Sequence, residues 1–141
     1  MSLAPLDNLV RIGKLKAEPA AQAEFDGLLR SGKVRLQDAG KSSLGLESRF
    51  DLAYNAAHAM ALAALRWHGY RSENRYLVFQ SLAHTLALPP EQWRVLDHAH
   101  RKRNLAEYEG NLEVDEALLA ALIRVADGLA KRVGALGALK G

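Results

Sequence analysis

The sequence predicts an all-α protein, an antiparallel up-and-down bundle of four main helices preceded by one or two short ones. Two observations lead to this prediction. The 141 residues are rich in Ala, Leu, Glu and Arg, which favour helices, and poor in β-branched residues. Apolar residues also recur at alternating spacings of three and four, and no alternating strand pattern of useful length is found.

The first part of the chain predicts short helical pieces. Residues 4–13 form a first short helix with three apolar residues on one side. A second helix starts near Pro19, a residue favoured in the first helical turn. The Ser-Gly pair at 31–32 is expected to interrupt it, with a further turn or two over 34–39. The composition of residues 40–45 predicts a loop.

Residues 46–67 carry the strongest helical pattern and predict the central helix of the bundle. Alanines along this helix allow a neighbouring helix to approach closely, and Gly69 is expected to end it. The apolar stripe comprises Leu46, Phe50, Ala53, Ala57, Met60, Ala64 and Trp67.

Two further main helices and the last one follow at short intervals. Ser72 is a candidate cap for a helix that buries Tyr76, Phe79, Ala83 and Leu86. Pro90 begins the next helix, which runs to about Glu109, and residues 111–113 form a short link. The stripe of the last helix consists of Leu118, Leu122, Val125, Leu129 and Val133.

These elements predict one domain over residues 1–141. Its core covers about 34–133, residues 1–32 are an N-terminal helical extension, and the glycine-rich 134–141 is a flexible tail. The apolar content of 49% suffices for a buried core, and without cysteine there are no disulfides or thiolate sites. No signal peptide or membrane span is recognised, so we expect a cytoplasmic protein. The net charge of +3 permits nucleic-acid binding without arguing for it.

Chemistry concentrates in residues 97–110, where Arg101, Lys102 and Arg103 follow one another. At the helical period, the inward stripe of this helix begins with Trp93 and Leu96 and continues through His100, Arg103 and Glu107. It therefore turns polar halfway along. Burial of Arg103 without a partner would be prohibitive, so these groups must face a cleft, a subunit interface or solvent.

A second interpretation makes the same stretch a solvated helix face. Asp97 then pairs with His100 or Arg101, and Arg103 with Glu107, each pair contributing a few tenths of a kcal/mol. The cations also lie toward the helix C-terminus, where the dipole favours them.

Residues 103–108, Arg-Asn-Leu-Ala-Glu-Tyr, resemble the signature of the HEPN superfamily of small helical domains, in which an Arg precedes a His by four to six residues. Residues 53–57 (AYNAA) and 69–71 (GYR) occur before it in the family's order, and the resemblance spans roughly 34–133. It implies a homodimer whose Arg-bearing helix lines a cleft at the two-fold axis. It further implies RNA binding or metal-independent RNA cleavage, often with a nucleotidyltransferase partner in a toxin–antitoxin pair or in defence.

The resemblance implies that Arg103 neutralises phosphate and that a His acts as acid or base. Here Tyr108 occupies the His position. Its phenol, with an ordinary pKa near 10, is a poor proton acceptor, but it can donate a proton or stack on a nucleobase of RNA. His100 lies one turn before Arg103 on the same face. The catalytic candidates are Arg103, Tyr108 and His100, and the nucleic-acid-binding candidates are Arg101, Lys102, Arg103, Asn104, Arg71 and Arg75.

Three functions follow: an HEPN-like RNA- or nucleotide-binding domain, a metal-independent endoribonuclease using Arg103 with Tyr108 or His100, and a non-catalytic helical dimerisation module.

No cofactor or metal site is expected. His98 and His100 point about 160° apart on a helix, which disfavours a shared metal. Asn55 is expected to make a helix–helix hydrogen bond or to support the Arg103 site.

Overall fold

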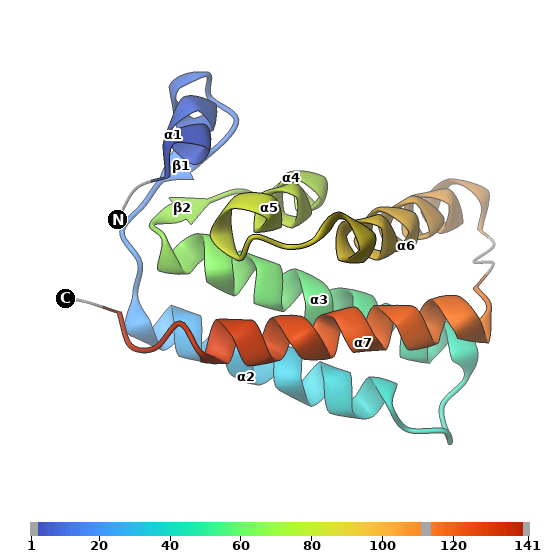
Figure 1. Cartoon of the computed structure of the whole chain (residues 1–141). Coiled ribbons are helices and arrows are strands. Elements are labelled where there is room, and N and C mark those ends of the chain that lie inside the picture. The colour runs from blue at the N-terminus through green and yellow to red at the C-terminus, as the bar shows by residue number, and fades with distance from the viewer. Residues whose placement is uncertain (1–2, 111–113, 140–141) are drawn as a thin grey trace.

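The computed structural model describes residues 3–110 and 114–139 and has the predicted helical bundle. The four long helices α2, α3, α6 and α7 form its body, with α1, α4 and α5 as short additions (Figure 1). The helices are α1 (Ala4–Arg11), α2 (Gln22–Ala39), α3 (Leu46–Trp67), α4 (Arg75–Gln80), α5 (Leu82–Thr85), α6 (Pro90–Glu109) and α7 (Glu116–Gly134), and the strands are β1 (Lys16–Ala17) and β2 (Tyr70–Arg71).

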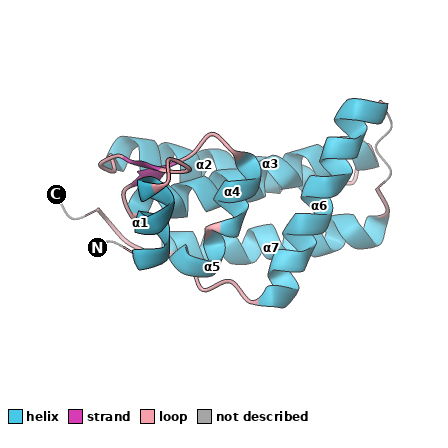
Figure 2. Cartoon of the chain, turned by 90° about the horizontal axis from the view of Figure 1, so that it is seen from above, coloured by secondary structure: helices cyan, strands magenta, loops and turns pink. Residues whose placement is uncertain are grey.

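Helix α3 lies between two layers. Helices α2 and α7 pack along one side of it, and α4 and α5 pack on the other. Helix α6 lies beside α4 in that second layer and also packs against α7 (Figures 1 and 2). Small side chains let these neighbours approach closely, as expected for an alanine-rich helix. The buried alanines of α3 are Ala53, Ala56, Ala57, Ala59, Ala61, Ala63 and Ala64.

The predicted interruption at residues 31–32 is wrong, because α2 runs unbroken from Gln22 to Ala39. Gly32 is buried within the helix, facing α3. A Cβ atom at this position would lie 2.6 Å from Met60 Cε and 3.4 Å from the Ala56 carbonyl oxygen. The glycine therefore serves the close crossing of two helices rather than a turn.

A buried arginine joins α3 to the N-terminal segment. Arg66 is only 2% exposed, and its Nε donates to Glu24 Oε1 at 2.6 Å. Its terminal nitrogens donate to the backbone carbonyls of Glu18 (2.9 Å) and Pro19 (2.8 Å). These bonds hold the chain beside the two-stranded antiparallel pairing of β1 with β2, in which Lys16 faces Arg71. No strand was predicted from the sequence.

The helix predicted after Ser72 is split in two. Asn74, not Ser72, caps α4 by accepting from the Leu77 amide at 3.0 Å. The helix ends at Gln80, and α5 begins at Leu82 after Ser81. Of the four residues predicted as buried here, Phe79 is in the core, but Ala83 is exposed.

The later helices follow the prediction. Helix α6 begins at Pro90 and ends at Glu109, before Gly110 in the left-handed conformation (φ 71°). All five apolar residues predicted for the stripe of α7 are buried. The predicted link at residues 111–113 lies outside the described residues.

The predicted flexible tail is in contact with the bundle over its described part. The Leu139 amide donates to Gln22 Oε1 at 2.8 Å, and Trp67 Nε1 donates to the Gly137 carbonyl at 3.2 Å. Residues 140–141 lie outside the described part. Within that part, no helix is both long and apolar enough to cross a bilayer.

Two glycines of α2 provide a matched test of the α2–α3 crossing. A Cβ atom at Gly27 would meet nothing within 4 Å, so Gly27→Ala should raise the free energy of unfolding by about 0.5–1 kcal/mol. Gly32→Ala gains the same helix propensity but overpacks Met60, and we expect a net loss of about 1 kcal/mol. Urea unfolding followed by circular dichroism measures both. Equal stabilisation by the two substitutions would contradict the close crossing.

Candidate functional site

The inward face of α6 turns polar halfway along, as the sequence predicted. Leu96 and Ala99 are buried, and the following residues on that face, His100 and Arg103, are half-buried. They face α3, which presents Tyr54 and Asp51. A group of polar and charged side chains therefore lies where α3, α4 and α6 meet. We call it the α3–α6 cluster, consisting of Asp51, Tyr54, Asn55, Arg75, Tyr76, Asp97, His100, Arg101, Arg103 and Asn104.

His100 is at the centre of the cluster, with both ring nitrogens engaged. Its Nδ1 lies 2.9 Å from the Tyr54 hydroxyl and its Nε2 lies 3.2 Å from Asn104 Nδ2. Its ring centroid is 5.0 Å from that of Tyr76. Burial lowers the pKa of His100, with Asp97 opposing and Arg75 reinforcing this shift. The imidazole is therefore biased toward its neutral form, which can act as a base.

Two guanidinium groups from different helices each lie over the ring of Tyr54. The Cζ atom of Arg103 is 5.1 Å from the ring centroid and that of Arg75 is 5.8 Å away. Both distances are within cation–π range. Tyr54 is 1% exposed, and burial raises the pKa of its hydroxyl, so this group stays protonated.

Arg103 forms an ion pair with Asp51 of α3. The solvated-face interpretation expected it to pair with Glu107 of its own helix instead. Asn55 holds Asp51 in place: its Nδ2 donates to the Asp51 carbonyl at 2.9 Å and to the carboxylate at 3.3 Å. Asn55 Oδ1 accepts from Arg75 Nη1 at 3.0 Å. Asn55 thus links α3 to α4 and also supports the partner of Arg103.

Asp97 is the second carboxylate of the cluster. It accepts from the Tyr76 hydroxyl at 2.9 Å and from Arg101 Nε at 3.1 Å. The hydrogen bond to Asp97 is the main reason that the pKa of Tyr76 is raised. Of the two pairings expected for Asp97, the structure has the one with Arg101.

Two predicted site residues lie away from the cluster. Tyr108 is 88% exposed, and five helical steps place it about 140° around α6 from Arg103. Arg71 belongs to β2 and pairs with Glu18 and Glu24 beside Arg66. The remaining candidates, Arg75, His100, Arg101, Arg103 and Asn104, make contacts within the cluster, and Lys102 follows on α6.

Asp51 is not among the site residues predicted from the sequence, and Tyr54 has no role in that prediction. A signal was present, because Asp51, Tyr54, Asn55 and His58 recur at spacings of three, one and three. That spacing makes one polar face on α3, opposite the alanine-rich face. Such a face in a helix predicted to be central implies partners on a neighbouring helix.

His58 extends the polar face beneath the cluster. Its ring packs edge-to-face on Phe79 with centroids 5.8 Å apart. Burial lowers the pKa of His58 to about 4, and the positive charge of Arg75 and the neighbouring His100 add to this shift. His58 is therefore neutral at physiological pH.

Metal binding and similarity to known proteins give no further direction. Over residues 3–110 and 114–139 there is no group of three or more His, Asp or Glu side chains arranged to hold a metal ion. His98 is exposed while His100 is half-buried, in keeping with their opposite directions on α6. Comparison with known proteins finds no family model that matches the chain, and no curated protein or solved structure that is significantly similar to it.

The buried histidine makes stability depend on pH. The unfolded state binds the His58 proton near pH 6.5 and the folded state only near pH 4, so stability is complete above 6.5 and falls as the pH drops toward 4. The slope contributed by His58 is at most about 1.4 kcal/mol per pH unit. His58→Phe should make the decline shallower, leaving the part due to His100, whereas His98→Gln on the exposed face should not. Urea unfolding between pH 4.5 and 7.5 measures this, and identical slopes for wild type and His58→Phe would contradict it.

Proposed function

We propose that this chain is an HEPN-like domain that binds RNA or a nucleotide at the α3–α6 cluster. The observation that carries the proposal is that Arg75 and Arg103, from separate helices, both lie over the Tyr54 ring, beside a half-buried His100 whose burial favours its neutral form. Guanidinium groups that two helices bring to one ring suit an anionic phosphate, which takes charge-assisted hydrogen bonds from them.

The charges of the cluster leave room for an anion. Arg75 has no carboxylate within ion-pair distance among the described residues; its contacts are with neutral groups, the Asn55 amide oxygen and the side chain of Tyr54. Arg103 is paired, but its side chain is 28% exposed and that of Asp51 is 48% exposed. A partly exposed pair of this kind is worth about 1 kcal/mol or less, so a phosphate oxygen can replace the carboxylate.

The partners proposed for the chain come from the same resemblance. We infer a homodimer in which the α6 helices of two copies line one cleft, and a nucleotidyltransferase partner in a toxin–antitoxin or defence system. Light scattering on the purified chain tests the first part. A monomer at all concentrations would argue against a cleft between subunits while leaving the cluster of one copy intact.

RNA binding is tested through the two members of the Arg103–Asp51 pair. Arg103→Ala should weaken binding of a fluorescent single-stranded RNA about tenfold and reduce the slope of log affinity against log salt by about 1. Asp51→Asn removes the competing carboxylate and should tighten binding. Anisotropy titrations at several salt concentrations measure both.

Arg132→Ala is the matched control. Arg132 is exposed on α7, a helix that contributes no residue to the cluster, and the substitution removes the same charge. The general loss of one cation should lower affinity only slightly. If Arg103→Ala and Arg132→Ala have the same effect, RNA binds through overall charge and the cluster is not the site.

A second candidate function, metal-independent RNA cleavage, is supported by the position of His100. Only its Nε2 points toward an exposed partner, Asn104, so a substrate 2′-hydroxyl would have to replace that amide to reach it. Arg103 on the same helix face would neutralise the phosphate under attack. This arrangement supports His100 over the exposed Tyr108 as the acid–base group.

Cleavage is tested by incubating the protein with structured RNA in EDTA. An active enzyme should produce 2′,3′-cyclic phosphate ends, and His100→Gln and Arg103→Ala should each lower the rate at least about 100-fold. Tyr108→Phe should leave the rate unchanged. Absence of cleavage above the Arg103→Ala background would leave binding as the function, and loss of activity in Tyr108→Phe would move the acid–base role to that phenol.

A further inference from the structure

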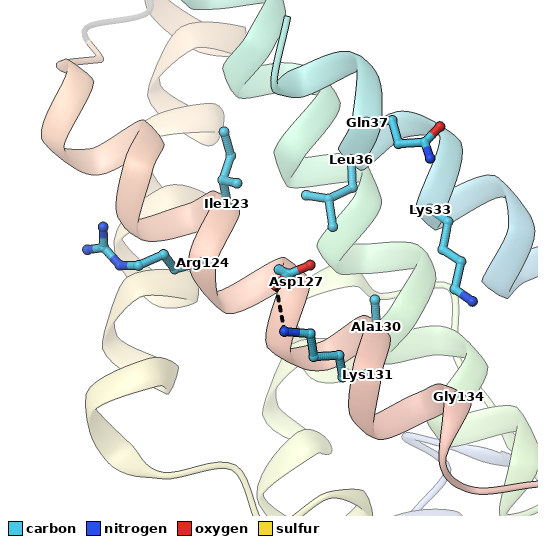
Figure 3. A pocket seen from close by; sticks show the side chains of 9 residues that line it. All are labelled: Lys33, Leu36, Gln37, Ile123, Arg124, Asp127, Ala130, Lys131 and Gly134. Atoms are coloured by element: carbon cyan, nitrogen blue, oxygen red, sulfur yellow. Dashed lines mark ion pairs between the residues drawn. The ribbon is translucent and has the colours of Figure 1, made fainter.

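A groove lies on the other side of α3 from the cluster, between α2 and α7. Its volume is about 680 Å³. All its lining residues come from these two helices, which form its two walls (Figure 3). They are Lys33, Leu36, Gln37, Ile123, Arg124, Asp127, Ala130, Lys131 and Gly134. We call it the α2–α7 groove.

The groove has an apolar floor and a cationic rim. Leu36 and Ile123 project into the space between the helices, and Lys33 and Lys131 stand on the two flanks (Figure 3). With Arg124, the lining holds three cations against one carboxylate, Asp127. Asp127 pairs with Lys131 at 3.3 Å, but both side chains are more than half exposed, so the pair holds Lys131 only weakly.

The dimensions of the groove suit a helix. From Ile123 to Gly134 the wall formed by α7 extends about 16 Å, the length of a helix of about 11 residues. With walls from two helices only, a small molecule would keep much of its surface in water, whereas small-molecule sites bury most of their ligand. Ala130 and Gly134, toward the C-terminal end of α7, leave space for side chains of a bound helix; a Cβ atom on Gly134 would meet nothing within 4 Å.

We propose that the α2–α7 groove binds an amphipathic helix of a partner protein, with acidic residues flanking its apolar face. The apolar side of such a helix covers Leu36 and Ile123, and its carboxylates face Lys33 and Lys131. Two copies of this chain facing each other here would bring like charges together, which disfavours a two-fold dimer through this surface. The lysines of the rim could contact the phosphates of an RNA, but the apolar floor offers its sugar–phosphate backbone no hydrogen-bond partner.

Two designed peptides of about 12 residues test the proposal on the full chain. Both carry Leu at spacings of three and four; one has Glu at the flanking positions and the other Lys. Fluorescence anisotropy at physiological salt should show the acidic peptide binding at least about tenfold more tightly, a difference of about 1.4 kcal/mol. The double variant Lys33→Glu/Lys131→Glu should reverse the preference.

Arg132→Glu is the matched control, since Arg132 is exposed next to Lys131 on α7 but does not line the groove. It should keep the preference for the acidic peptide. Equal binding of the two peptides, or the same effect from the control and the double variant, overturns the proposal. So does an RNA that displaces the acidic peptide and loses affinity in the double variant but not in Arg132→Glu, which would make the groove a nucleic-acid surface. None of these outcomes depends on Arg103, so the proposed RNA site is tested separately.

Discussion

The structure depends on the burial of α3 between two layers of helices. The polar side chains on the covered faces of this helix are cut off from water, and an unpaired buried polar group costs about 1–3 kcal/mol, more for a charge. Each buried polar residue of α3 therefore needs a partner from a neighbouring element. At one end Arg66 is satisfied by Glu24 and by backbone carbonyls of the segment before α2. Nearer the other end, Tyr54 is satisfied by His100 of α6.

The same requirement builds the candidate site. His100 forms a hydrogen bond with the hydroxyl of the buried Tyr54 and is itself partly buried. Burial lowers the pKa of His100 and so favours the neutral imidazole, which can accept a proton. The two arginines then stack on the ring that His100 helps to fix. The pairing of Arg103 with Asp51 is partly exposed and is worth about 1 kcal/mol or less. An anionic ligand proposed for this cluster therefore has only a weak ion pair to displace.

Periodicity in the sequence was enough to predict the bundle, the bounds of α3 and α6, and the buried stripe of α7, because these are local properties of one helix. Periodicity did not predict the features that depend on contacts between residues far apart in the sequence. A glycine after a serine predicts a turn, but at Gly32 the requirement is space for Met60 of another helix. Strands of two residues, such as β1 and β2, have no period to detect. For the site, the polar face through Asp51 and Tyr54 was visible in the sequence, but its pairing with α6 depends on how the layers stack.

Because α3 separates the α3–α6 cluster from the α2–α7 groove, the two surfaces face different directions and share no residue. A partner helix in the groove would therefore leave the cluster open to a second ligand. Both surfaces are cationic, so at low salt a polyanion is attracted to either one, and charge alone cannot tell them apart. What distinguishes them is the surface between the charges. The groove has aliphatic side chains that favour binding of the apolar face of a helix, whereas the cluster has hydrogen-bonding groups at fixed distances. Selectivity for each ligand should thus persist at salt concentrations that screen the shared charge.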